Sequence, residues 1–138
     1  MSLEVLIVDD DKIIIFLHRI MLEKSELAQS PLSFLNGKEA LKYISEDANS
    51  NKDYLILLDI NMPEMNGWEF LDAIKDKPFA NQLFVVIVTS SIDSSDKEQA
   101  MKYEHVIDYY EKPIDTNCCM QIKLLPEISK HFNNPSVV

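Results

Sequence analysis

Four short apolar runs in this chain end on residues that can hold a cation or a phosphoryl group. In chain order these residues are Asp9, Asp10, Asp59, Thr89, Ser90 and Lys112. Short apolar runs predict buried parallel strands, and open α/β sheets place their sites at the carboxyl ends of strands. We therefore expect carboxylates, a hydroxyl and an ammonium to meet at one rim of a sheet.

Such a rim suits Mg²⁺ and phosphoryl transfer. Mg²⁺ prefers oxygen ligands, usually one or two carboxylates together with water and phosphate oxygens. Asp59 is then placed to attack phosphorus and form an acyl phosphate. Lys112 and Thr89 would contact the phosphoryl oxygens, and the Lys112–Pro113 bond can be cis, which would aim the lysine inward. Asp11 is expected to cap the following helix instead.

The elements that position these residues alternate along the chain. Strands are predicted at 3–8, 31–35, 54–58, 83–88 and 106–110, and helices at 12–24, 38–46, 68–75, about 95–103 and 116–132. This alternation implies right-handed crossovers and a parallel sheet that is covered on both faces. The predicted fold class is α/β, a doubly wound (βα)5 domain with a central five-stranded parallel sheet.

The first helix has apolar residues at helical spacing. Ile13, Phe16, Leu17 and Ile20 are predicted to form its buried face. His18 is expected to face solvent and not to act as a phosphotransfer histidine, because His18, His105 and His131 do not form a cluster in the sequence.

Later segments give further local predictions. Ser95 is expected to cap the fourth helix, with Glu98 as its capping-box partner. Pro126 must kink or divide the last helix, and residues 133–138 are expected to fray. Trp68 is expected to be partly buried and to report metal binding by its fluorescence.

Composition narrows the function classes. A length of 138 residues suits one domain, and a net charge of −10 argues against binding to nucleic acid or to an anionic membrane. No apolar run approaches the ~20 residues of a membrane span, and no signal peptide is expected. Cys118 and Cys119 are adjacent, which favours reduced thiols in a cytoplasmic protein over a disulfide framework.

With these motifs in order, the chain resembles the receiver domains of two-component response regulators, in particular stand-alone ones like the chemotaxis regulator. The resemblance covers residues 3–132 and implies a flavodoxin-like fold. It is carried by Leu6-Ile7-Val8-Asp9-Asp10, Asn36-Gly37-Lys38-Glu39-Ala40-Leu41, Leu57-Leu58-Asp59-Ile60-Asn61-Met62-Pro63-Glu64-Met65-Asn66-Gly67, Val88-Thr89-Ser90 and Tyr109-Tyr110-Glu111-Lys112-Pro113.

The resemblance implies a metal site that contains the phosphoacceptor. Asp59 corresponds to the phosphoacceptor, which also contributes to the Mg²⁺ site. Asp10 corresponds to a direct Mg²⁺ ligand, and Asp9 to its partner, which often acts through water. Asn61 corresponds to the residue whose backbone carbonyl completes the metal site.

The resemblance also implies a switch. Thr89 corresponds to the switch hydroxyl, and Ser90 to the small residue whose backbone N–H reaches the phosphoryl group. Lys112 corresponds to the phosphate contact, and Tyr109 to the aromatic residue that swings inward with Thr89. Taken without the resemblance, Tyr109 is more simply interpreted as a half-exposed strand residue.

The expected function is a phosphorylation-dependent switch, not an enzyme in the ordinary sense. A sensor histidine kinase or a histidine phosphotransfer protein would donate the phosphoryl group. Only one helix and a tail follow Pro113, so output is expected through a partner on the surface of the fourth helix, fifth strand and fifth helix. The expected state is a monomer or a phosphorylation-dependent dimer.

Two other functions are compatible with the pattern. A receiver-like scaffold would bind partners without phosphorylation, and the complete rim argues against it. An aspartyl-phosphate phosphatase would need a second aspartate two residues after its nucleophile, and this chain has Asn61 there.

Overall fold

A five-stranded parallel sheet forms the centre of the molecule. The structure is a computed structural model that describes residues 2–49, 51–90 and 93–132. The strands are β1 (Ser2–Val8), β2 (Leu32–Phe34), β3 (Lys52–Leu58), β4 (Leu83–Thr89) and β5 (Val106–Glu111). The helices are α1 (Lys12–Lys24), α2 (Gly37–Asp47), α3 (Gly67–Ile74), α4 (Ser94–Met101), α5 (Thr116–Leu124) and α6 (Pro126–Ser129), with a 3₁₀ turn, η1 (Ala80–Gln82).

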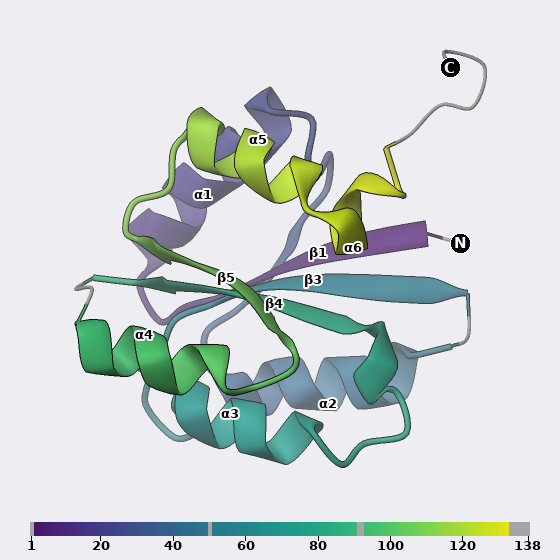
Figure 1. The fold of residues 1–138 in the computed structure, drawn as a ribbon, viewed down its shortest axis with the longest axis vertical. Coiled ribbons are helices and arrows are strands. Elements are labelled where there is room, and N and C mark those ends of the chain that lie inside the picture. Colours follow the sequence, from purple (N-terminus) through teal and green to yellow (C-terminus); the bar gives the residue numbers. More distant parts are fainter. Residues whose placement is uncertain (1, 50, 91–92, 133–138) are drawn as a thin grey trace.

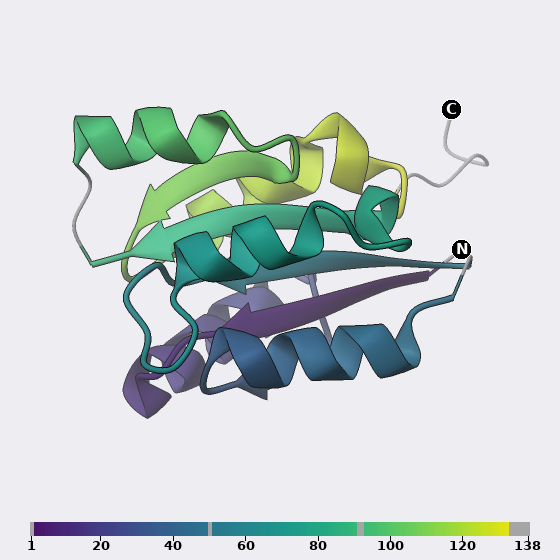
Figure 2. The same ribbon diagram turned by 90° about the horizontal axis from the view of Figure 1, so that it is seen from below.

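The strand order is β2-β1-β3-β4-β5, and every neighbouring pair is parallel. All five carboxyl ends therefore lie on one edge, where the arrowheads point in Figure 2. Val8 at the end of β1 is in register with Leu58 at the end of β3. The residues that follow these two strands, Asp9 and Asp59, are consequently neighbours across the sheet.

Helices cover both faces of the sheet, which confirms the doubly wound α/β fold predicted from the sequence. Helices α1, α5 and α6 lie on one face, and α2, α3 and α4 lie on the other (Figure 1). Each face has its own hydrophobic core, and strand residues alternate between the two. On β3, Leu55 and Leu57 belong to the core beside α1, whereas Ile56 between them belongs to the core beside α3. Both faces of the strands are apolar for this reason.

The buried face of α1 differs from the prediction. Ile13 and Phe16 are 72% and 62% exposed, whereas Ile15, His18 and Leu22 are buried. The expectation that His18 faces solvent was also wrong. Five apolar residues in succession, 13–17, are compatible with more than one apolar stripe, so spacing alone did not select the stripe that meets the sheet.

Helix ends follow local hydrogen bonding. Asp11 caps α1, as predicted, because its side chain accepts from the backbone N–H groups of Ile13 and Ile14. The cap of α4 is Asp93 and not Ser95, whose own N–H donates to the Asp93 carboxylate. An aspartate one residue before the helix thus takes the position predicted for a serine inside it.

The carboxyl-terminal helical region is divided at Pro126, as predicted, into α5 and α6. His131 and Lys130, just after α6, contact the buried Asp53 near the start of β3, with Nε2 and Nζ at 2.9 and 3.3 Å from Oδ2. Residues 133–138, predicted to fray, lie outside the described residues. Within the described ranges, no helix has both the length and the apolar composition to cross a membrane.

Candidate metal and phosphoryl site

Asp9 and Asp59 lie side by side at the rim because the sheet pairing continues one residue beyond each strand. The Asp9 N–H donates to the Phe34 carbonyl at 3.0 Å, and the Asp59 N–H donates to the Val8 carbonyl at 3.0 Å. Both residues are buried, at 2% and 4% exposure. The sheet therefore fixes two carboxylates in a place from which water is largely excluded.

A third carboxylate completes an acidic cluster. Asp9, Asp10 and Asp59 each offer one oxygen, and these oxygens lie within 4.8 Å of one another. Asp10 is exposed, so the cluster opens to solvent on its side. Three converging carboxylate oxygens of this kind suit a hard divalent cation such as Mg²⁺.

Local backbone turns orient the two buried carboxylates. The Asp11 N–H donates to Asp9 Oδ1 at 2.9 Å, and the Asn61 N–H donates to Asp59 Oδ1 at 3.3 Å. The second bond brings the Asn61 backbone next to Asp59. The role predicted for the Asn61 carbonyl as a metal ligand stays a prediction.

Lys112 supplies the positive charge at the rim. Its Nζ lies 2.7 Å from Asp9 Oδ2 and 3.2 Å from Asp59 Oδ2. Its backbone N–H donates to the Thr89 carbonyl at 2.7 Å, which ties the end of β5 to the end of β4. The Lys112–Pro113 peptide bond is cis.

The electrostatics of the rim favour an added cation. Burial raises the pKa of Asp9 even though Lys112 donates a hydrogen bond to it. Burial and then the charge of Asp9 raise the pKa of Asp59. Burial alone would lower the pKa of Lys112, but its contacts with the two carboxylates outweigh burial and raise it. The positive charge of Lys112 does not balance the negative charges of the three carboxylates. The oxygen donors of Asp9, Asp10 and Asp59 therefore fit Mg²⁺.

Gly67 allows the start of α3 to approach the site closely. A Cβ on Gly67 would lie 2.7 Å from Ile60 Cα and 2.8 Å from the Asp59 carbonyl oxygen. The Gly67 N–H donates to the Ile60 carbonyl at 2.8 Å. The role of Gly67 in bringing α3 against the Asp59 turn depends on packing that the sequence pattern does not reveal.

The three other predicted residues lie on β4 and β5 or directly after them. Thr89 is buried at the end of β4, and Ser90 follows it as an exposed residue. Tyr109 pairs with Ile87 across the two strands and is buried, which contradicts the half-exposed interpretation. Its hydroxyl has no hydrogen-bond partner among the residues that the structure describes. The switch roles of Thr89 and Tyr109 stay predictions.

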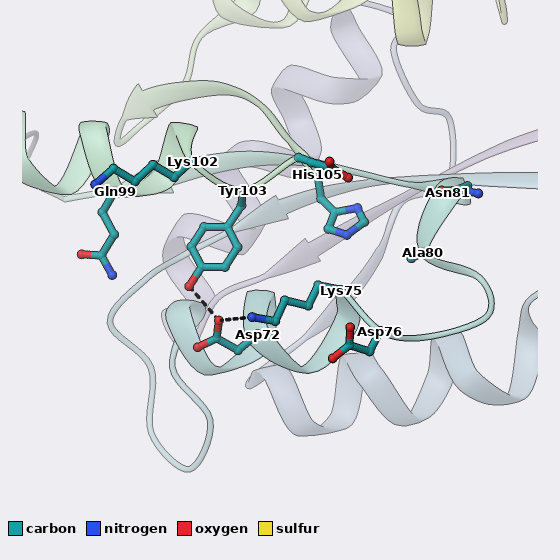
Figure 3. A pocket seen from close by; sticks show the side chains of 10 residues that line it. Asp72, Lys75, Asp76, Ala80, Asn81, Gln99, Lys102, Tyr103 and His105 are labelled. Atoms are coloured by element: carbon teal, nitrogen blue, oxygen red, sulfur yellow. Dashed lines mark hydrogen bonds and ion pairs between the residues drawn. The ribbon is translucent and has the colours of Figure 1, made fainter.

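A hollow elsewhere on the surface does not share this chemistry. It has a volume of about 530 Å³ and lies between α3, η1 and the segment that joins α4 to β5 (Figure 3). There Asp72 accepts from the Tyr103 hydroxyl at 2.8 Å and lies 3.7 Å from Lys75 Nζ. The Tyr103 ring also stacks on Trp68, which is partly buried, as predicted. The lining mixes acidic and basic side chains and includes none of the rim residues, so the acidic cluster remains the candidate site.

The fold and the rim together define a flavodoxin-like protein with an acidic cluster at the carboxyl edge of its sheet. The family model for the response regulator receiver domain matches residues 5–122, and the chain belongs to this family. Receiver domains are signalling domains that bind Mg²⁺ at an acidic pocket and interact with histidine kinases or phosphotransfer proteins.

Individual relatives agree with this assignment. A two-component response regulator from Cytophaga hutchinsonii has a structure with a TM-score of 0.78 at 28% identity, covering 97% of this chain and 98% of that one. Response regulator Rcp1 from Synechocystis is 30% identical over 67% of this chain and 65% of its own length. Chemotaxis protein CheV1 from Helicobacter pylori is 28% identical over 70% of this chain but only 30% of its own length. The chain thus spans less than two thirds of these two curated relatives.

Proposed function

We propose that this chain is a phosphoacceptor response regulator. It takes a phosphoryl group from a histidine kinase or a histidine phosphotransfer protein onto Asp59 and signals through protein–protein contacts in the cytoplasm. The observation that carries the proposal is the placement of Asp59: it is buried, lies beside Asp9, and has Lys112 Nζ 3.2 Å from one of its oxygens.

The chemistry follows from these groups. An Asp59 oxygen attacks phosphorus, the bond from phosphorus to the donor imidazole nitrogen breaks, and its electron pair stays on that nitrogen. Lys112, already held between Asp9 and Asp59, neutralises negative charge on a phosphoryl oxygen. Thr89 and the Ser90 N–H are assigned to the other oxygens. Mg²⁺, held by Asp9, Asp10, Asp59 and the Asn61 carbonyl, would supply further positive charge.

Signalling is assigned to β4, β5 and the helices beside them. Thr89 and Tyr109 lie on paired strands, and the register places Thr89 opposite Glu111, two residues beyond Tyr109. Movement of Thr89 toward a phosphoryl group would change the packing around Tyr109 and bias the surface formed by α4, β5 and α5. This is a shift between two existing states, and a partner protein would bind the favoured one.

The donor protein is proposed to contact α1. Ile13 and Phe16 are exposed on the first turns of this helix, directly after the cap Asp11 and close in sequence to the acidic cluster. A protein that brings a phosphohistidine to Asp59 must cover this rim. Exposed apolar side chains next to the rim provide surface whose burial favours such a complex.

Replacement of the acceptor tests the function. We expect Asp59→Asn to abolish Mg²⁺-dependent, acid-labile labelling by acetyl phosphate, because the amide cannot form the acyl phosphate. Asp53→Asn is the matched control, since Asp53 is also a buried aspartate and lies at the other end of β3. Labelling that persists undiminished in Asp59→Asn would refute the assignment. Absence of Mg²⁺ binding in the wild type would support a phosphorylation-independent scaffold.

A further inference from the structure

His18 is a buried imidazole that the proposed chemistry does not use. It lies on α1, is 1% exposed, and belongs to the side of that helix that faces the sheet. Its Nε2 accepts a hydrogen bond at 3.2 Å from the backbone N–H of Ile114. An aliphatic residue would fill such a position without the cost of burying a polar ring, so the contact with Ile114 is the feature that distinguishes histidine here.

Ile114, whose N–H donates to His18, lies two residues after Lys112. The segment from Lys112 to Asp115 joins β5 to α5 and carries the only ammonium that contacts the acidic cluster among the described residues. The backbone N–H of Lys112 is bonded to Thr89, and that of Ile114 is bonded to His18. The Ile114 side chain is itself buried. The segment is therefore attached to β4 on one side and to α1 on the other.

The His18 imidazole must be neutral to accept the hydrogen bond from Ile114. An Nε2 that accepts belongs to a neutral ring whose proton is on Nδ1. Burial, and secondarily the charge of Lys112, lower the pKa of His18 to about 4, so the accepting form prevails at neutral pH.

We propose that His18 is a positioning residue for Lys112. By holding the Ile114 N–H, it keeps the segment after β5 in the place from which Lys112 Nζ reaches both Asp9 and Asp59. This inference rests on the proposed function, because Lys112 matters to phosphoryl transfer only if Asp59 is the acceptor.

A double-mutant cycle tests the proposal by measuring the rate at which acetyl phosphate labels Asp59 at saturating Mg²⁺ and neutral pH. We expect His18→Leu to slow labelling by roughly tenfold, because small displacements of a charged contact weaken transition-state stabilisation. His18→Gln should recover most of the rate, since its Oε1 can accept the Ile114 N–H. In a Lys112→Ala background, His18→Leu should change the remaining rate by less than about twofold. If His18 acts only by positioning Lys112, its replacement has no further effect once the ammonium is gone, so the two effects are not additive.

Controls separate positioning from general stability. Leu22→Ala removes another buried side chain of α1, at the end away from the rim, and should lower stability while leaving the labelling rate unchanged. Denaturant titration confirms that each variant is folded at the assay temperature. If His18→Leu does not fold, His18→Asn replaces it, because its shorter amide does not reach the position of Nε2.

The outcomes are distinct. Equal rates in wild type and His18→Leu, or an equal loss with and without Lys112, would overturn the role of His18 while leaving the proposed function intact. A failure of His18→Gln to recover any rate would do the same. Absence of labelling in the wild type itself would overturn the proposed function and this inference with it.

Discussion

His18 illustrates how burial sets the charge state of a side chain. The pKa of this imidazole falls from 6.5 to about 4, first because burial penalises its charged form and second because Lys112 is positive. The unfolded chain therefore binds a proton more readily than the folded protein between these two pH values. The contribution of neutral His18 to stability is fully present above about pH 6.5 and is lost as the pH falls toward 4.

The free energy of unfolding should show this linkage. We expect the wild type to lose about 3 kcal/mol between about pH 6.5 and about pH 4 through His18, and His18→Gln to lack this component. Urea denaturation of both proteins across this range measures it, because the other titrating groups are common to the two. Parallel stability profiles would contradict the expectation.

Helix α1 has apolar residues on both its buried side and its exposed side. Ile15, His18 and Leu22 are buried against the rest of the domain, whereas Ile13 and Phe16, on the first turns after the cap Asp11, remain exposed. A helix that is apolar on more than one side usually contacts something on each of them. The exposed side is therefore the surface that we assign to the donor protein.

A negative charge at position 16 should slow phosphoryl transfer from a donor protein but not from the small molecule acetyl phosphate. We expect Phe16→Glu to slow transfer from a phosphorylated histidine kinase or phosphotransfer protein by at least about tenfold, since it removes apolar burial worth more than about 1.4 kcal/mol. The same variant should be labelled by acetyl phosphate at the wild-type rate, because the small donor needs no docking surface. Met120→Glu, an exposed apolar residue on α5, is the matched control. Equal slowing with both donors would instead indicate damage to the site.

At the level of the whole chain, sequence patterns predicted the fold because strand type, helix alternation and crossover rules restrict the topology strongly. They also placed Asp9, Asp59 and Lys112 together, since residues after parallel strands share one edge. They did not predict the orientation of α1, the Asp93 cap or the close approach at Gly67. These features depend on which of several acceptable local arrangements packs best against the sheet.

Excess negative charge at the rim should link metal binding to the stability of the entire domain. We expect Mg²⁺ to raise the thermal midpoint, with a gain of about 2.7 kcal/mol when the free ion is at about a hundred times its Kd. Its removal with EDTA should reverse the gain. Scanning calorimetry at matched ionic strength measures this effect. Asp10→Asn should reduce the gain and Asp53→Asn should retain it; equal gains in both would exclude the acidic cluster as the binding site.

The contact of His131 with Asp53 has a practical consequence. It places the end of the described chain beside the start of β3, and Ser2 begins β1 at the same edge of the sheet, where its N–H donates to the Asn51 carbonyl. The rim with Asp59 lies at the opposite edge. A tether attached just before Ser2 would therefore hold the protein on a biosensor surface with the proposed phosphoryl site facing the solution, so that binding and release of the proposed donor can be timed without obstruction by the support.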